Sequence, residues 1–258
     1  MKYCFRAAMF LSMIAATLAA GELPVADGVY VVSRSVPSAQ ATQAAAADAK
    51  YIYAISSTGV TKYDRSTGKE VAASTGKAQH LNSGFIWDGK LLCAHSNFPK
   101  KPDQSDIRVL DPESMKLEIF HTFENPPGSL TWVLRRGEDW WCHFAHYGGD
   151  KAKSILVRYD AGWQETGRWN YAKNLIDDWG NYSLSGGIWV GDELLATGHD
   201  KKLLYRLRLP KEGNVIECIE VVRSPFPGQG IAVDPGTNEL IGIERAKGIV
   251  FARYETKK

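Results

Sequence analysis

The chain is built from an internal repeat, which limits the folds it can adopt. Each copy begins with small residues that lead into an apolar strand, passes through a turn, and enters a second apolar strand. The small-residue entries occupy residues 83–87, 128–132, 185–189 and 228–232. The period is roughly 45–50 residues, which is typical of propeller blades of four strands rather than of helical repeats.

Strands are expected nearly throughout the repeat. Apolar and polar residues alternate in many places, for example in residues 155–159 and 203–208, whereas no stretch keeps apolar residues at spacings of three and four. This pattern predicts an all-β chain. A degenerate first copy covers residues 51–63, and dividing the chain by the period predicts about five blades.

The two ends of the repeat region complement each other. The last copy, residues 230–255, supplies only three strands, while an apolar strand at residues 29–36 has no place in any copy. If this strand completes the last blade, it hides strand edges that would otherwise aggregate. We therefore expect a five-bladed β-propeller of four-stranded blades, with the ring closed by the N-terminal strand.

The first residues have the pattern of a secretory signal. Lys2 and Arg6 come before or at the start of an apolar run, residues 7–18, which ends in Ala-Ala-Gly. This run is too short for a stable membrane span, and no other segment could serve as one. We expect a signal peptide at residues 1–21, one propeller domain at residues 22–258, and a secreted or periplasmic protein without a membrane anchor.

Cysteine content and charge exclude some classes of protein. Cys93, Cys142 and Cys218 remain after the predicted signal, too few for a disulfide framework, so buried free thiols are expected. A bridge between Cys93 and Cys142 stays open. The formal net charge of +2 at pH 7 is too small to indicate a nucleic-acid partner.

Four side chains with metal-binding chemistry end the second strand of successive copies. They are His95, His146, His199 and Glu244. In a ring of blades they would converge on the axis, and imidazoles with a carboxylate suit a divalent transition metal with an open coordination position. We expect Zn, Mn or Fe, with the identity left open. The alternative is that each imidazole is a structural hydrogen-bonding residue.

Other residues are candidates for contact with a substrate. His80 and Tyr182 could act as base or proton donor on the same rim, and Arg245 could bind a carboxylate. Asn97 and Asp200 follow two of the histidines and could orient their rings. Several lysines follow the histidines in the loops, where they either attract an anionic substrate or are simply solvated: Lys100, Lys101, Lys151 and Lys153.

Two short stretches carry a resemblance. His-Leu-Asn-Ser-Gly at residues 80–84 and Ser-Leu-Ser-Gly-Gly at residues 183–187 resemble a group of secreted, largely uncharacterised bacterial propellers, some called cycloisomerases, over about residues 29–254. Other propellers, among them peptidyl-amidating lyases, carotenoid oxygenases and oligogalacturonate lyases, hold axial metals through histidines. By that likeness His95, His146, His199 and Glu244 correspond in role. Glutaminyl cyclotransferases also have five blades, but too little of their sequence pattern occurs here to transfer residues.

These features together predict a metal-dependent propeller enzyme of lyase or isomerase type. Its substrate would be a small sugar acid or hydroxylated carboxylate at the axial mouth, where the metal stabilises the enolate-like charge formed on proton abstraction. A non-catalytic propeller that binds a glycan or a protein is one alternative, and a metal-assisted lactone or glycoside hydrolase is another. A small-molecule or carbohydrate partner is expected, with a negative charge as one option.

Overall fold

The computed structural model describes residues 22–256, and most regular structure in them is β-strand. The strands follow one another in antiparallel groups of four. The first group is β2 (Ala44–Ala47), β3 (Tyr51–Ile55), β4 (Val60–Asp64) and β5 (Glu70–Ala73). The second is β6 (His80–Trp87), β7 (Lys90–Ser96), β8 (Ser105–Leu110) and β9 (Leu117–Phe123).

Two further groups repeat this order. One is β10 (Ser129–Arg136), β11 (Asp139–Ala145), β12 (Ile155–Tyr159) and β13 (Glu165–Tyr171). The next is β14 (Gly186–Val190), β15 (Glu193–Thr197), β16 (Leu203–Arg208) and β17 (Val215–Arg223). The prediction of four-stranded units in the order of the chain is confirmed for these groups.

The last group combines both ends of the described chain. It consists of β18 (Ala232–Val233), β19 (Leu240–Glu244), β20 (Gly248–Glu255) and β1 (Val25–Pro37). The pairing of β1 with β20 is antiparallel, with Val29 opposite Glu255 and Val36 opposite Ile249. The unassigned strand of the sequence therefore covers the outer edge of the last group, as predicted.

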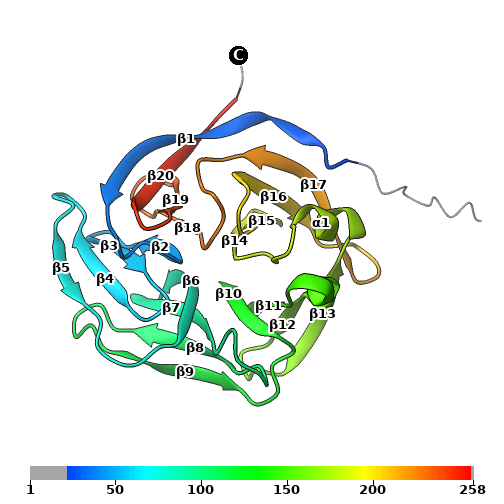
Figure 1. Ribbon diagram of the computed structural model, residues 1–258, viewed down its shortest axis with the longest axis horizontal. Coiled ribbons are helices and arrows are strands. Elements are labelled where there is room, and N and C mark those ends of the chain that lie inside the picture. The colour runs from blue at the N-terminus through cyan, green and yellow to red at the C-terminus, as the bar shows by residue number, and fades with distance from the viewer. Residues whose placement is uncertain (1–21, 257–258) are drawn as a thin grey trace, which may run out of the picture.

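Figure 1 shows the groups arranged around a common centre in a propeller-like way, with β2, β6, β10, β14 and β18 nearest the middle. Some groups are separate sheets, and others are joined into a larger sheet. Short parallel pairings join β13 to β17 and β17 to β1, so three groups form one sheet of 12 strands, while the first two groups are separate four-stranded sheets.

The hydrophobic core lies between neighbouring groups. Trp132 of β10 and Leu194 of β15 belong to one buried apolar cluster, and Leu92 of β7 and Phe144 of β11 belong to another. Trp189 also packs on the first of these clusters. Full burial of each large apolar side chain contributes about 1.5–3 kcal/mol. The tryptophans of the repeat therefore join neighbouring groups, as the sequence predicted.

Small residues are required where the innermost strands meet. A Cβ atom on Gly230 would lie 2.6 Å from Cβ of Ala44 and 2.8 Å from Cα of Ser83. These three residues come from the last, first and second groups, so their backbones approach closely at the centre. The small-residue entries of the repeat have this physical cause.

Helices play a small part in the described chain. A 3-10 helix (Gly148–Lys153) and α1 (Lys173–Asp178) lie in loops, and no helix among residues 22–256 is long and apolar enough to span a membrane. Cys93 and Cys142 are buried free thiols, as expected, and burial raises the pKa of both. The predicted signal peptide lies outside the described residues.

Candidate functional site

The predicted metal ligands do not occupy one equivalent position in the repeat. His95 lies inside β7, whereas His146 follows the last residue of β11 by one position and His199 follows the last residue of β15 by two. Successive side chains of a strand point to opposite faces, so an offset of one residue changes the direction of a side chain. The prediction of a common phase is wrong, and the three imidazoles have different surroundings.

A cavity of about 190 Å³ lies where residues from all the groups meet. We call it the central cavity. Seven of the residues that line it carry an amide or an aliphatic hydroxyl: Thr42, Gln43, Ser57, Asn82, Thr131, Ser185 and Gln229. Among residues 22–256, no aspartate or glutamate lines it. The three residues predicted from sequence to act on a substrate, His80, Tyr182 and Arg245, all line it together with His199.

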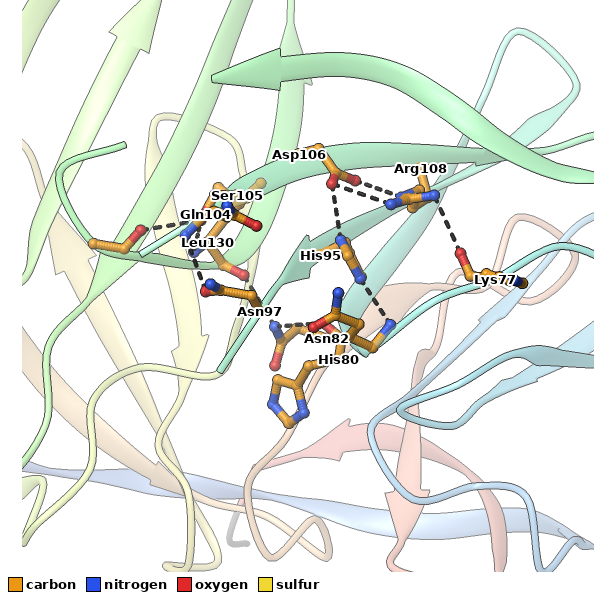
Figure 2. Close-up of polar contacts among 12 residues, drawn as sticks. Lys77, His80, Asn82, His95, Asn97, Gln104, Ser105, Asp106, Arg108 and Leu130 are labelled. Atoms are coloured by element: carbon orange, nitrogen blue, oxygen red, sulfur yellow. Dashed lines mark hydrogen bonds and ion pairs between the residues drawn. The ribbon is translucent and has the colours of Figure 1, made fainter. Parts of the chain in front are cut away.

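His80 is the first residue of β6 and presents a half-buried imidazole to the central cavity. Its ring nitrogens have no hydrogen-bond partner in the described chain, and Figure 2 shows the ring apart from the contacts around His95. Burial lowers the pKa of His80 below its ordinary value, and the nearby rings of His95 and His199 add to this effect. A neutral imidazole with a free nitrogen is the form that accepts a proton.

Asn82 fixes the strand that carries His80. Its Nδ2 donates to the backbone oxygen of Leu130 at 3.0 Å and lies 3.4 Å from the backbone oxygen of His80 itself. The side chain is 8 % exposed and joins the second group to the third. The position of the His80 backbone is therefore set by contacts with two groups.

Arg245 enters the central cavity because the chain turns directly after β19. Its Nη2 lies 3.4 Å from Nε2 and 3.5 Å from the backbone oxygen of His199. Within residues 22–256 no carboxylate pairs with this guanidinium, since the adjacent Glu244 pairs with Lys247 at 2.6 Å. The sequence required a turn here for Arg245 to reach the site, and Ala246, with φ of 57°, lies in that turn.

His199 is held by partners on both sides. Its Nδ1 lies 2.7 Å from Oδ1 of Asp200, and its ring stacks on Tyr182 with 3.8 Å between centroids. Burial lowers the pKa of His199, although the Asp200 carboxylate opposes this shift. The orienting role expected for Asp200 is therefore present in the geometry.

Aromatic rings form a continuous row along the central cavity, which we call the aromatic row. Its members, in order of contact, are His80, Phe98, Tyr147, Tyr182 and His199, with centroid distances of 5.4, 4.7, 6.2 and 3.8 Å. Burial raises the pKa of Tyr147 to about 12, so its phenol stays protonated. Most neighbouring rings of the row are inclined to each other, and only Tyr182 and His199 are stacked, so the row offers apolar ring faces and edges beside the polar lining.

His95 lies outside the central cavity and has both ring nitrogens in use. Nε2 accepts the backbone N–H of Gln79 at 2.9 Å, which leaves the proton on Nδ1, and Nδ1 donates to Oδ2 of Asp106 at 3.0 Å. Arg108 holds the same carboxylate from the other side, 2.5 Å from Oδ1 (Figure 2). The ring is 4 % exposed and acts as a structural link between β7, β8 and the segment before His80.

The remaining predicted ligands are also engaged elsewhere. Nε2 of His146 lies 2.6 Å from the backbone oxygen of Pro127, and Glu244 forms its ion pair with Lys247. In the described part of the chain, no three histidine, cysteine, aspartate or glutamate residues are grouped closely enough to hold a metal ion. The arrangement does not fit a metal held by all four residues, so no step below goes through a metal.

The loop residues named from the sequence serve other contacts. Lys101 pairs with Asp103 at 2.5 Å, and Lys151 donates to the backbone oxygen of Gly180 at 2.7 Å. Asn97 closes its own loop through the backbones of Pro102 and Gln104 instead of orienting a histidine. Arg245 is therefore the one lysine or arginine that lines the central cavity among residues 22–256.

Sequence reasoning missed part of the lining. Gln229 lies within a small-residue entry, between Gly228 and Gly230, and Asn82 directly precedes another entry. Phe98 lies in the loop between β7 and β8, and the other copies of the repeat offer no equivalent residue by which to recognise it. A polar residue within or next to a small-residue entry was the available signal, because these entries approach the centre of the molecule.

Comparisons with known proteins support the fold. No protein-family model matches the chain, and no curated protein matches it. The group called cycloisomerases thus has no support from sequence families. A crystal structure of Myxococcus xanthus glutaminyl cyclase is similar, with a TM-score of 0.62, 12% identity, and coverage of 91% of this chain and 100% of that one. A chain of the mitotic checkpoint complex has a TM-score of 0.46, 8% identity and 98% coverage of each chain.

Proposed function

We propose that the chain is a five-bladed β-propeller enzyme that binds a small hydroxylated carboxylate in its central cavity and abstracts a proton from it. The observation that carries this proposal is one juxtaposition. A guanidinium without a carboxylate partner, Arg245, shares a cavity free of aspartate and glutamate with a half-buried imidazole, His80, that has no hydrogen-bond partner in the described chain.

Arg245 would bind the substrate carboxylate. A guanidinium matches a carboxylate in a planar, two-pronged geometry, and its charge attracts the anion into a cavity that holds no competing acid. As a proton leaves the carbon next to the carboxylate, negative charge spreads onto the carboxylate oxygens. Arg245 stabilises this enolate-like charge more strongly than it stabilises the bound substrate.

His80 would take the proton. The C–H bond breaks, its electron pair enters the enolate, and the proton forms a new N–H bond on the neutral ring. In an isomerisation the proton returns to a different carbon or face. In an elimination the electron pair forms a double bond while a hydroxyl leaves the next carbon, and the hydroxyl of Tyr182 supplies the proton that converts it to water.

Export is part of the same proposal. The basic and apolar pattern of residues 1–21 is typical of a cleaved signal. Sequencing the N-terminus of the protein from the producing cell and from its surroundings tests this point directly.

The fold likeness suggests a second candidate, cyclisation of an N-terminal glutaminyl residue, which is the activity for which the Myxococcus protein is named. His80 could serve as the base in this reaction as well. Charge disfavours it, because a terminal ammonium would meet Arg245 and no carboxylate in the central cavity. Release of ammonia from a glutaminyl peptide would favour this candidate.

The proposed function is tested by isotope exchange. The protein is incubated in D₂O with uronates, aldonates and hydroxy acids, and loss of the C–H signal beside the carboxylate is followed by proton NMR. Exchange should occur with at least one substrate, should vanish in His80→Gln, and should persist in Glu244→Gln, whose side chain lies outside the central cavity. Binding without exchange in any compound would favour the non-catalytic binding module.

A further inference from the structure

Gln229 has a backbone conformation that is unfavourable for its residue type. Its φ is 73°, in the left-handed region where a side chain costs free energy and where glycine or asparagine is the usual choice. Strain of this kind persists only where the surroundings impose it, and it concentrates at ligand sites. The position therefore calls for an explanation of why it holds a glutamine.

The surroundings impose this conformation through contacts from two segments, residues 197–199 and Gln43. The backbone N–H of Gln229 donates to the oxygen of Gly198 at 3.2 Å, its oxygen accepts the hydroxyl of Thr197, and the next N–H, of Gly230, donates to the oxygen of Gln43 at 2.9 Å. Before it, a Cβ on Gly228 would lie 2.4 Å from the backbone of His199. The segment is fixed between the fourth and first groups.

The Gln229 side chain contributes nothing to this framework. The residue is only 3 % exposed, it lines the central cavity, and its carboxamide has no hydrogen-bond partner among residues 22–256. The amide nitrogen and oxygen are not completely enclosed by the protein, so they open onto the central cavity and are free to bond a ligand there. A glycine here would avoid the strain, and the carboxamide makes no hydrogen bond within the described chain, so the protein's own fold gives no reason for glutamine.

We infer that the Gln229 carboxamide is the specificity-determining group that recognises a hydroxyl of the ligand, and that the ligand is a sugar acid of monosaccharide size. This inference rests on the proposed function for the carboxylate. Gln229 and Arg245 are anchored to the same backbone segment, Gly198–His199, so a ligand held by the guanidinium places its neighbouring hydroxyl near the amide.

The size and lining of the central cavity fit this ligand class. Its volume of about 190 Å³ equals the share of roughly six water molecules in the liquid, which suits a single sugar ring. A carboxamide both donates and accepts, as a hydroxyl does, so the two pair in either orientation. The aromatic row supplies ring faces and edges against which the apolar C–H face of a sugar can pack.

The test compares two anions of equal charge and similar size. Glucuronate or galacturonate carries hydroxyls, whereas cyclohexanecarboxylate carries none. Dissociation constants from calorimetry should show that the wild-type protein prefers a uronate by about tenfold or more, since a site built to bond a hydroxyl rejects an analogue that lacks it. In Gln229→Gly this preference should disappear through weaker uronate binding, with cyclohexanecarboxylate unchanged.

The melting temperature provides the second readout. Gln229→Gly should melt at the wild-type temperature or above it, because the substitution removes backbone strain, whereas a structural glutamine would give a lower value. Unchanged preference for the uronate in this variant would overturn the inference and leave the proposed function standing. The carboxylate proposal would be overturned instead if neutral methyl glycosides bound through Gln229 and their hydroxyls, with the same affinity in Arg245→Gln as in the wild type. A wild-type protein that binds none of these compounds contradicts both.

Discussion

The guanidinium of Arg245 rests against the ring of His199, with 3.4 Å between Nη2 and Nε2, and no carboxylate in the described chain pairs with it. The partner is a ring whose burial lowers its pKa, so the positive charge of Arg245 is not neutralised. An anion placed within about 4 Å would gain about 1–4 kcal/mol at dielectric constants between those of water and a protein surface. This relationship is the basis of our proposal that the central cavity binds an anion.

The pH dependence of activity should report the ionisation of His80. Only the neutral ring accepts a proton, and burial lowers the pKa of His80 below 6.5. The value of kcat/KM should therefore fall as the pH drops through that lowered pKa and should be level just above it. A pH–rate profile on the substrate found by isotope exchange measures this. An acidic limb centred above pH 6.5, or one that persists in His80→Gln, would contradict the role of His80.

Replacing His95 should affect stability rather than metal content. His95→Ala leaves the N–H of Gln79 and the carboxylate of Asp106 without their partner, and each loss of this kind costs about 1–3 kcal/mol. Urea unfolding measures the loss, and plasma mass spectrometry of the purified protein measures metal. A stoichiometric metal that disappears in His95→Ala, with unchanged stability, would restore the metal site predicted from the sequence.

A buried ion pair between the first and last groups should control stability in acid. Arg65 Nη2 lies 2.5 Å from Oδ2 of Asp234, whose side chain is fully buried. Burial by itself raises the pKa of Asp234, but hydrogen bonds from Arg65 and Thr237 outweigh it and lower the pKa. The pair therefore stabilises the fold above the ordinary pKa of an aspartate, and this contribution is lost as the pH falls through the lowered value.

Asp234→Asn should cost about 3–5 kcal/mol near neutral pH, because it leaves the Arg65 charge without its partner. It should also flatten the loss of stability in acid. Glu255→Gln is the matched control, since its pair with Arg253 is exposed and such pairs contribute about 0–1 kcal/mol. Equal effects of the two variants in urea unfolding would refute the importance of the buried pair.

Removal of β1 should expose the edge of β20. A protein that begins after Pro37 loses the antiparallel partner of residues 248–255, and a free strand edge pairs with other chains. Size-exclusion chromatography with light scattering should detect aggregates or a poorly folded product. A truncated protein that stays monomeric and melts as the longer protein does would show that this strand is dispensable.

Periodicity predicted much of the fold because strand spacing and turn residues are local properties. The four-stranded groups and the pairing of residues 29–36 with the last group follow from counting strands against a fixed period. The residue at which a strand ends is not set by local periodicity, because it depends on pairing with neighbouring strands. His95, His146 and His199 looked equivalent in sequence, but the strands end at Ser96, Ala145 and Thr197, and an offset of one residue reverses a side chain.

Only part of the candidate site could be predicted from the sequence. The side-chain chemistry of His80, Tyr182 and Arg245 and their positions near strand ends predict contact with a substrate, and all three line the central cavity. Gln229 could not be identified, because its significance lies in a positive φ and in an amide without a partner. Neither property can be read from the order of residues.

Titration of the protein with a uronate and with its neutral amide tests the central claim most directly. Calorimetry on the wild-type protein should give tighter binding of the acid, weakened by salt, and Arg245→Gln should lower affinity for the acid by about tenfold or more while leaving the amide unaffected. Glu244→Gln, one residue away but outside the central cavity, should match the wild type. Equal binding of acid and amide, unchanged in Arg245→Gln, would contradict the account.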